Sequence, residues 1–387
     1  MDYAFLEDAL DSDEAFVHVG DRFDDTMRYL TRFGGPDRPY AFVYAAESAM
    51  LCPPSLFVEQ ARREFPGDRV LPADEQTATT ASGRAIEAVE SVADVETLRV
   101  PVHLRHDAAV RLEQAGYALE STTAVDDARA IKSGAELTAL QHVQDIAQRG
   151  MARAETVLAT VETDDIEDGM PLQWDGDELT TERLRRTINT VLAEHGIADA
   201  GNTVIGAGET CADLHFTGDD TIRAGETVLI DISPRGPMGY YGDVTRTFVP
   251  GGTEGWPRRA YVAVEYAQDA ALEVLADGAG TMANRVHTEA AAELSAHGFA
   301  VGDGETGFYH GVGHGVGMSL HEAPSLRAET ALAAGNVVTV EPGVYDPSIG
   351  GVRIEDLVVV TADGYENLTD YPRSLVPTVR DHSSSFA

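Results

Sequence analysis

Four acidic residues and one histidine lie within apolar, strand-like segments in the second half of the 387-residue chain. They are Asp231, Asp243, His314, Glu341 and Glu355. An ionised carboxylate among Val, Ile and Leu costs several kcal/mol to desolvate unless it is paired, so repeated buried acids require a shared cation. No two of the five are at the i, i+4 spacing of a helix, so a sheet must bring them together, each from a different strand. The pattern therefore predicts a two-metal hydrolase site carried on a sheet.

The donor types restrict the metal. Four oxygen donors and one imidazole, with no thiolate, suit Mn, Fe, Co or Zn better than a structural Cys-rich zinc site. Ions in a two-metal site lie about 3.5–4 Å apart and need bridging carboxylates, which four acids supply. A single acid on a strand is more often a solvated surface residue, but Glu341 directly follows the run Val337–Val340, which is typical of a strand buried on both faces.

Three of the 12 histidines gather in the segment FYHGVGHGVGMSLHEAP (308–324). They are His310, His314 and His321. Alternating glycines separate them, and because interior glycines cost a helix about 1 kcal/mol each, we expect an extended segment that passes close to another backbone. The grouping indicates one metal ligand together with partners for proton transfer. His215, in CADLHF, is a fourth candidate.

These motifs resemble those of the pita-bread metallopeptidases, a family that includes methionine aminopeptidase, aminopeptidase P, prolidase and the non-metal relative creatinase. The resemblance runs from near Ile131 to Pro372. Upstream, MRYLTRFGG (27–35) resembles the Tyr-Leu-Thr segment in the amino-terminal domain of prolidases and aminopeptidase P, a domain that methionine aminopeptidases lack. The resemblance therefore favours the prolidase and aminopeptidase P branch.

The resemblance implies an α+β fold. A pita-bread catalytic domain, in which helices cover a curved antiparallel sheet, follows a smaller α/β creatinase-like amino-terminal domain. We place these domains at 129–387 and 1–128. Apolar patterning predicts strands at 39–46 and 97–104 and helices at 107–116, 135–159, 179–195 and 258–276. The terminal SSSFA (383–387) is expected to fray.

Carried over residue by residue, the resemblance implies that Asp231 chelates one of two divalent metal ions, while His314 and Glu341 hold the other. Asp243 and Glu355 bridge the pair. The expected metal is manganese, with Co, Fe or Zn as alternatives. Shared by both ions, a water becomes a metal-bound hydroxide that attacks the substrate carbonyl.

The resemblance also implies catalytic roles. Glu341 accepts the proton of the attacking water. His321, in the HEAP motif, donates a hydrogen bond to the substrate as the tetrahedral intermediate forms. His310 and His215 line the site around the residue that follows the scissile bond, and Arg353 lies behind the metal ligands.

The expected reaction is hydrolysis of the Xaa-Pro bond in dipeptides or at the amino terminus of longer peptides. Two alternatives share the fold: a creatinase-like amidinohydrolase that works without metal, and a non-catalytic binding module. Both would be expected to lose ligand positions, and all five are present. One departure from the commonest family spacing is an extra residue between Asp231 and Asp243, in the turn-forming stretch PRGPMG (234–239), which we expect near the substrate entrance.

Charge restricts the setting and the partners. The chain has 28 Lys+Arg against 65 Asp+Glu, a net charge of −37, and Lys132 is its only lysine. Such a chain resembles a halophile protein, in which molar salt shortens the Debye length to about 3 Å and screens self-repulsion. Without a basic patch, nucleic acid and anionic membranes are not expected partners. The expected partners are short peptides and a second copy of the chain, with which it would form a homodimer.

The amino terminus and the cysteines suggest a cytoplasmic location. The first residues are acidic where a signal peptide needs a basic region, and no apolar run approaches the 18 or so residues of a membrane span. Cys52 and Cys211 are the only cysteines and are expected as reduced thiols, although one bridge between them is the alternative. Cys211 lies four residues before His215, but the metal set is complete without it.

Overall fold

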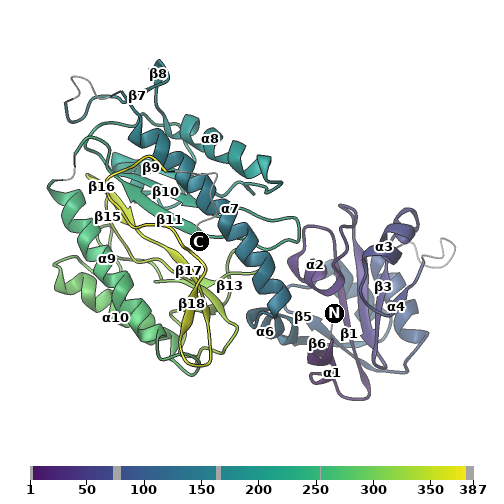
Figure 1. Ribbon diagram of the computed structural model, residues 1–387. Helices are drawn as coiled ribbons and strands as arrows, with labels where there is room; N and C mark the ends of the chain where they lie inside the picture. Colours follow the sequence, from purple (N-terminus) through teal and green to yellow (C-terminus); the bar gives the residue numbers. More distant parts are fainter. Residues whose placement is uncertain (1–2, 73–79, 163–166, 253, 381–387) are drawn as a thin grey trace. The chain divides into compact units, whose positions relative to one another are not determined.

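The chain separates into two compact units, Met1–Arg129 and Ala130–Ala387 (Figure 1). The computed structural model describes residues 3–72, 80–162, 167–252 and 254–380. The fraying predicted for 383–387 therefore lies outside the described residues. Within the described residues, no helix is long and apolar enough to cross a membrane.

The first unit is a mixed α/β domain built on a six-stranded sheet in the order β4-β3-β2-β1-β5-β6. Its strands are β1 (Glu14–Gly20), β2 (Tyr40–Ala45), β3 (Ser48–Cys52), β4 (Arg69–Val70), β5 (Thr97–Pro101) and β6 (Ala118–Thr122). The first three pair antiparallel, and β4, β5 and β6 add in parallel. Its helices are α1 (Ala4–Glu7), α2 (Asp25–Thr31), the 3-10 helix η1 (Ser55–Phe57), α3 (Val58–Glu64), α4 (Ala81–Glu90), α5 (His106–Gln114) and the connecting α6 (Ala124–Ala130).

The elements predicted for this unit are confirmed, with one shortened. The strand predicted at 97–104 ends at Pro101, because residues 102–103 turn and Leu104 N donates to Pro101 O at 3.0 Å. The helix predicted at 107–116 is α5, and Gly116 takes the positive φ of 104° that allows the chain to leave it.

Among its described residues the second unit has four long helices, three of which the sequence predicts. They are α7 (Gly134–Ala159), α8 (Thr181–Glu194), α9 (Trp256–Leu275) and α10 (Ala283–Ala296). At the start of α7, the Glu136 carboxylate accepts from Ser133 N at 2.9 Å and from its hydroxyl at 2.7 Å, which fixes that end. The sequence analysis missed α10, because two of its four buried residues, Ala283 and Ala290, are alanines, and only Val286 and Leu294 carry its helical period.

The strands of this unit form antiparallel pairs throughout the described residues. One sheet has the order β11-β10-β9, and another has the order β13-β12-β14-β17-β18. Their strands are β9 (Thr203–Ala207), β10 (Val228–Ile232), β11 (Val244–Phe248), β12 (His314–Gly315), β13 (Glu322–Ser325), β14 (Val337–Val340), β17 (Asp356–Val360) and β18 (Tyr365–Asn367). Smaller elements are the pairs β7 (Gln173–Trp174) with β8 (Asp177–Glu178) and β15 (Gly343–Asp346) with β16 (Gly350–Arg353), and the 3-10 helix η2 (Gly208–Ala212).

Each of the two larger sheets of the second unit has its own pair of helices and its own core. Helices α7 and α8 pack on β9, β10 and β11, whereas α9 and α10 pack against β14, β16 and β17 (Figure 1). The two sheets meet where Thr245, on β11, bridges Glu355 in front of β17. The predicted arrangement of helices covering antiparallel strands is confirmed. The line along which the two larger sheets meet, called the seam below, passes through the predicted ligand Glu355.

Candidate functional site

The five predicted ligands come from both sides of this seam. Asp231 lies on β10 and His314 on β12, as predicted for strand residues. The other three lie just beyond strand ends: Asp243 before β11, Glu341 after β14, and Glu355 between β16 and β17. The prediction that every ligand sits within a strand is therefore wrong for these three. At Glu341 the reason is local, because the following Pro342 has no N–H with which to continue the ladder.

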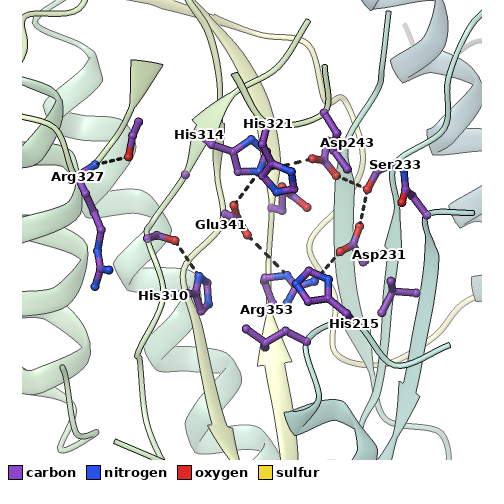
Figure 2. Close-up of a pocket in the computed structure, with 18 residues that line it drawn as sticks. His215, Asp231, Ser233, Asp243, His310, His314, His321, Arg327, Glu341 and Arg353 are labelled. Atoms are coloured by element: carbon purple, nitrogen blue, oxygen red, sulfur yellow. Dashed lines mark hydrogen bonds and ion pairs between the residues drawn. The ribbon is translucent and has the colours of Figure 1, made fainter. Parts of the chain in front are cut away.

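All five side chains belong to one cluster. Asp243, His314 and Glu355 each offer a ligand atom, and these atoms lie within 4.8 Å of one another. His314 Nε2 is 3.3 Å from Glu341 Oε1 and 3.9 Å from Asp243 Oδ2. On the other side, Ser233 Oγ lies 3.1 Å from an oxygen of Asp231 and 2.9 Å from one of Asp243. Figure 2 shows Asp231 and Asp243 on one side of the pocket, facing His314 and Glu341 on the other.

Two of the acids are buried with their negative charge only partly compensated, Asp243 by His314 and Glu355 by Arg353. Asp243 is 4% exposed and Glu355 is 2% exposed. Burial, with the added repulsion of Asp231, raises the pKa of Asp243 well above its usual range, and burial with the repulsion of Asp243 does the same to the pKa of Glu355. Thr245 Oγ1 donates to Glu355 at 2.7 Å, but a neutral hydroxyl does not balance a charge. Buried carboxylate oxygens whose negative charge is only partly balanced suit a divalent cation as ligands.

Arg353 lies beneath the acids, where the sequence analysis expected it. Its guanidinium is buried, and Nη2 is 2.7 Å from Asp231 Oδ2. Burial raises the pKa of Asp231, and Arg353 opposes that rise. Arg353 Nη1 donates to the Tyr345 hydroxyl at 3.0 Å. The arginine therefore orients one acid and fixes the hydroxyl of Tyr345.

The three remaining histidines line the same pocket, a cavity of about 340 Å³ (Figure 2). Burial lowers the pKa of His310 to about 4, so its ring is neutral. Nδ1 then donates to Gly311 O at 2.7 Å, and Nε2 accepts from the Tyr345 hydroxyl at 3.0 Å. His215 is exposed at the rim.

His321 is accessible and close to the cluster. Its ring centroid is 4.1 Å from that of His314, and burial together with His314 lowers the pKa of His321. The next residue, Glu322, pairs with Lys132 Nζ at 2.8 Å, and this only lysine of the chain is buried. The ion pair fixes the backbone that carries His321.

The glycines beside His314 allow another backbone to approach, as predicted. A Cβ at Gly313 would lie 2.0 Å from Thr339 O, and a Cβ at Gly315 would lie 2.3 Å from Ala323 O. Only glycine fits at such distances. The expected extended segment is present only in part, because β12 is two residues long and residues 317–321 bend before β13 begins. His314 is therefore held between the backbones of two neighbouring strands, β13 and β14.

Sequence reasoning missed three hydroxyls that contact the cluster. They are Ser233, Thr245 and Thr339. Each lies two residues from a predicted ligand, so alternation along a strand places it on the same face, and this spacing could have identified all three. Thr339 Oγ1 accepts from His314 N at 3.0 Å and lies 3.2 Å from Glu341 Oε1.

The loop with the extra residue packs on the glycine-rich segment. Tyr241 N donates to Gly317 O at 2.9 Å, and Arg235 Nη2 donates to Met318 O at 3.2 Å. Of residues 233–243, Ser233 and Asp243 line the pocket. Cys211 is free and buried, and its thiol donates to Thr227 O at 3.3 Å instead of facing the cluster.

Residues 138–362 match the model of metallopeptidase family M24. The chain belongs to this family. It is 38% identical over 180 residues to the Xaa-Pro dipeptidase of Pyrococcus furiosus, which covers 46% of this chain and 49% of that protein. It is 34% identical over 190 residues to the Xaa-Pro dipeptidase of Lactobacillus helveticus, which covers 46% of this chain and 48% of that protein. The chain spans about half the length of these curated relatives that it matches.

Solved structures match this chain over nearly its whole length. The prolidase of Pyrococcus horikoshii OT3 superposes with a TM-score of 0.77 at 26% identity, covering 96% of this chain and 98% of that one. The X-Pro aminopeptidase of Thermotoga maritima superposes with a TM-score of 0.79 at 21% identity, over 96% and 99%, and shows the fold alone. The predicted fold is confirmed: an amino-terminal mixed α/β domain precedes a pita-bread M24 domain.

Proposed function

We propose that this M24 protein is a dinuclear metal-dependent peptidase that hydrolyses the Xaa-Pro bond in dipeptides or at the amino terminus of longer peptides. The observation that carries the proposal is the convergence of four carboxylates and one imidazole on one pocket, with Asp243 and Glu355 buried and only partly compensated. Similarity to the Xaa-Pro dipeptidases of P. furiosus and L. helveticus supports the substrate class.

The ligand set would hold two divalent ions, with manganese expected and Co, Fe or Zn as alternatives. We assign Asp231 to one ion, His314 and Glu341 to the other, and Asp243 and Glu355 to both. Bound there, such ions lower the pKa of a water and polarise the substrate carbonyl. Arg353 and Ser233 keep the Asp231 carboxylate turned toward Asp243. Thr339 accepts from the backbone N of His314 and donates to the Glu341 carboxylate, so it holds these two residues together.

The remaining roles belong to side chains that reach the substrate. Glu341 accepts the proton of the attacking water, since its carboxylate lies at the pocket wall. His321 donates a hydrogen bond to the carbonyl oxygen as negative charge develops there, a contribution of about 2.7–4 kcal/mol for donors of this kind. His310, fixed by Gly311 and Tyr345, and the exposed His215 shape the part of the pocket that takes the residue after the scissile bond. Short peptides are the proposed substrates, and a homodimer is the proposed assembly.

A substrate panel tests the specificity. Protein reconstituted with Mn²⁺ in molar KCl is assayed on Ala-Pro, a longer Xaa-Pro peptide, Met-Ala-Ser and creatine. Turnover of either proline substrate is the expected result, and their ratio separates a dipeptidase from an aminopeptidase P. Preference for Met-Ala-Ser would overturn the proposed specificity, and metal-independent turnover of creatine would overturn the proposed class.

A variant pair tests the role of His321. His321→Ala should lower kcat at least about a hundredfold while leaving metal content unchanged, because His321 is a substrate contact and not a ligand. His142→Ala is the matched control, since His142 is an exposed histidine on α7. Loss of metal from His321→Ala, or equal activity in the two variants, would contradict the assignment.

A further inference from the structure

Two imidazoles and a carboxylate meet in the first unit, outside the peptidase pocket. His18 lies on β1, Asp24 is the N-cap of α2, and His103 lies in the turn after β5. Each offers one ligand atom, and the three atoms lie within 4.8 Å of one another. The peptidase pocket is lined by residues of the second unit, so the proposed mechanism uses none of these three.

The separations suit a single ion. His18 Nε2 is 2.9 Å from Asp24 Oδ2, and His103 Nε2 is 3.9 Å from the same oxygen. Ligands around a tetrahedral zinc ion with bonds of 2.0–2.1 Å lie about 3.3–3.4 Å apart, between these two values. The side chain of His103 is 46% exposed, so a small rotation of this ring can close the set.

The two inner ligands are already oriented. His18 is fully buried, and within the described residues its Nδ1 has no hydrogen-bond partner, so the contact with Asp24 is what positions the ring. Asp24 uses Oδ1 to accept from Met27 N at 2.9 Å, which leaves Oδ2 for the histidines. A Cβ at Gly20 would lie 2.5 Å from Asp24 Oδ2, so glycine leaves the space that this oxygen occupies.

A simple helix cap explains only part of this arrangement. Capping α2 needs one carboxylate oxygen, whereas two histidine rings, one on β1 and one in the turn after β5, direct Nε2 at the other. The rings stand edge to face, with centroids 5.2 Å apart at 75°, as two ligands of one ion can. We infer that His18, Asp24 and His103 bind a divalent transition-metal ion such as Zn²⁺, with the remaining coordination open to water beside His103.

Zinc binding by the full-length chain tests this site separately from the peptidase site. The background variant Asp243→Asn/Glu355→Gln removes two buried acids of the peptidase cluster. In this background, equilibrium dialysis against Zn²⁺ at pH 8 should give about one ion per chain fewer after His103→Ala. His106→Ala is the matched control, because His106 is an exposed histidine three residues away, and it should leave the stoichiometry unchanged.

Cobalt gives a second readout. Co²⁺ added to the background protein should produce visible d–d absorption that His103→Ala removes and His106→Ala retains. If the background protein does not fold, the same difference of about one ion is measured between wild type and wild type carrying His103→Ala. Equal metal binding by the His103 and His106 variants would overturn the inference. Because the readout is a difference in stoichiometry, it stands even if the protein proves not to be a peptidase.

Discussion

Replacing Arg246 with methionine should lower the free energy of unfolding of the second unit by about 3 kcal/mol, the lower end of the range for a broken buried ion pair. Arg246 is 1% exposed, and its Nη2 lies 2.8 Å from Asp356 Oδ1. Its guanidinium also donates to the carbonyl oxygens of Thr245, Glu355, Tyr371 and Pro372. One side chain thus joins β11, the start of β17 and the carboxy-terminal segment.

The magnitude follows from what the substitution leaves behind. Removing one partner of a buried pair costs about 3–5 kcal/mol, because the other charge remains desolvated. Asp356 is 2% exposed, but Asn367 Nδ2 still donates to it at 3.0 Å and Arg373 Nη2 lies 3.7 Å away. These contacts reduce the penalty toward the lower end. The double variant Arg246→Met/Asp356→Asn should lose less stability than the single one, since no uncompensated charge remains.

Fluorescence can follow the relevant unit alone. The chain has two tryptophans, Trp174 and Trp256, and both belong to the second unit. Urea titration in molar KCl then reports the stability of that unit. Arg285→Met is the matched control, because Arg285 and Asp277 form an ion pair at 3.7 Å in which both side chains are more than half exposed. Losing this exposed pair should lower the free energy of unfolding by less than about 1 kcal/mol. Equal losses for Arg246→Met and Arg285→Met would refute the reasoning.

Three further predictions concern metal, salt and thiols. Chelation should abolish peptidase activity, and full hydrolysis by metal-free protein would contradict this. In elemental analysis, Asp243→Asn or Glu355→Gln should remove both ions, whereas His314→Ala should chiefly weaken the binding of one. With a net charge of −37, the unfolding midpoint should rise steeply between low and molar KCl, and a flat profile would mean that the acids are already compensated. Burial raises the pKa of Cys52 to about 12 and that of Cys211 to about 11, so at pH 8 only on the order of 10⁻³ of the Cys211 thiol is ionised. A disulfide reagent should label neither cysteine in the folded protein and both after unfolding, and rapid labelling of native protein would contradict their burial.

The sequence predicted those parts of the fold whose signals are local. Helix α7 was predictable because Ser133 and Glu136 mark its start and apolar residues recur at helical spacing along it. The acids of the site stood out because Val, Ile and Leu surround them. Tyr345 could not be found in this way, since it contacts His310 across 35 residues of sequence.

Long-range polar contacts explain the rest of what was missed. Arg246 reaches partners more than 100 residues away, and nothing in its neighbourhood VTRTF distinguishes it from a surface arginine. The cluster of His18, Asp24 and His103 has the same character, because its third member comes from the turn after β5, a neighbour of β1 in the sheet that is distant in sequence. Such sets depend on which strands become neighbours, and strand order is not encoded in local spacing.

The seam between the two sheets has a consequence for how the second unit melts. Asp231 and Asp243 belong to the half whose core contains α7 and α8, whereas His314 and Glu341 belong to the half whose core contains α9 and α10. Anything that binds both pairs at once can remain bound only while both halves are folded, and its binding free energy then opposes the unfolding of either half. Occupancy of the cluster should therefore sharpen the thermal transition as well as raise its midpoint, since two separately packed halves become one cooperative unit.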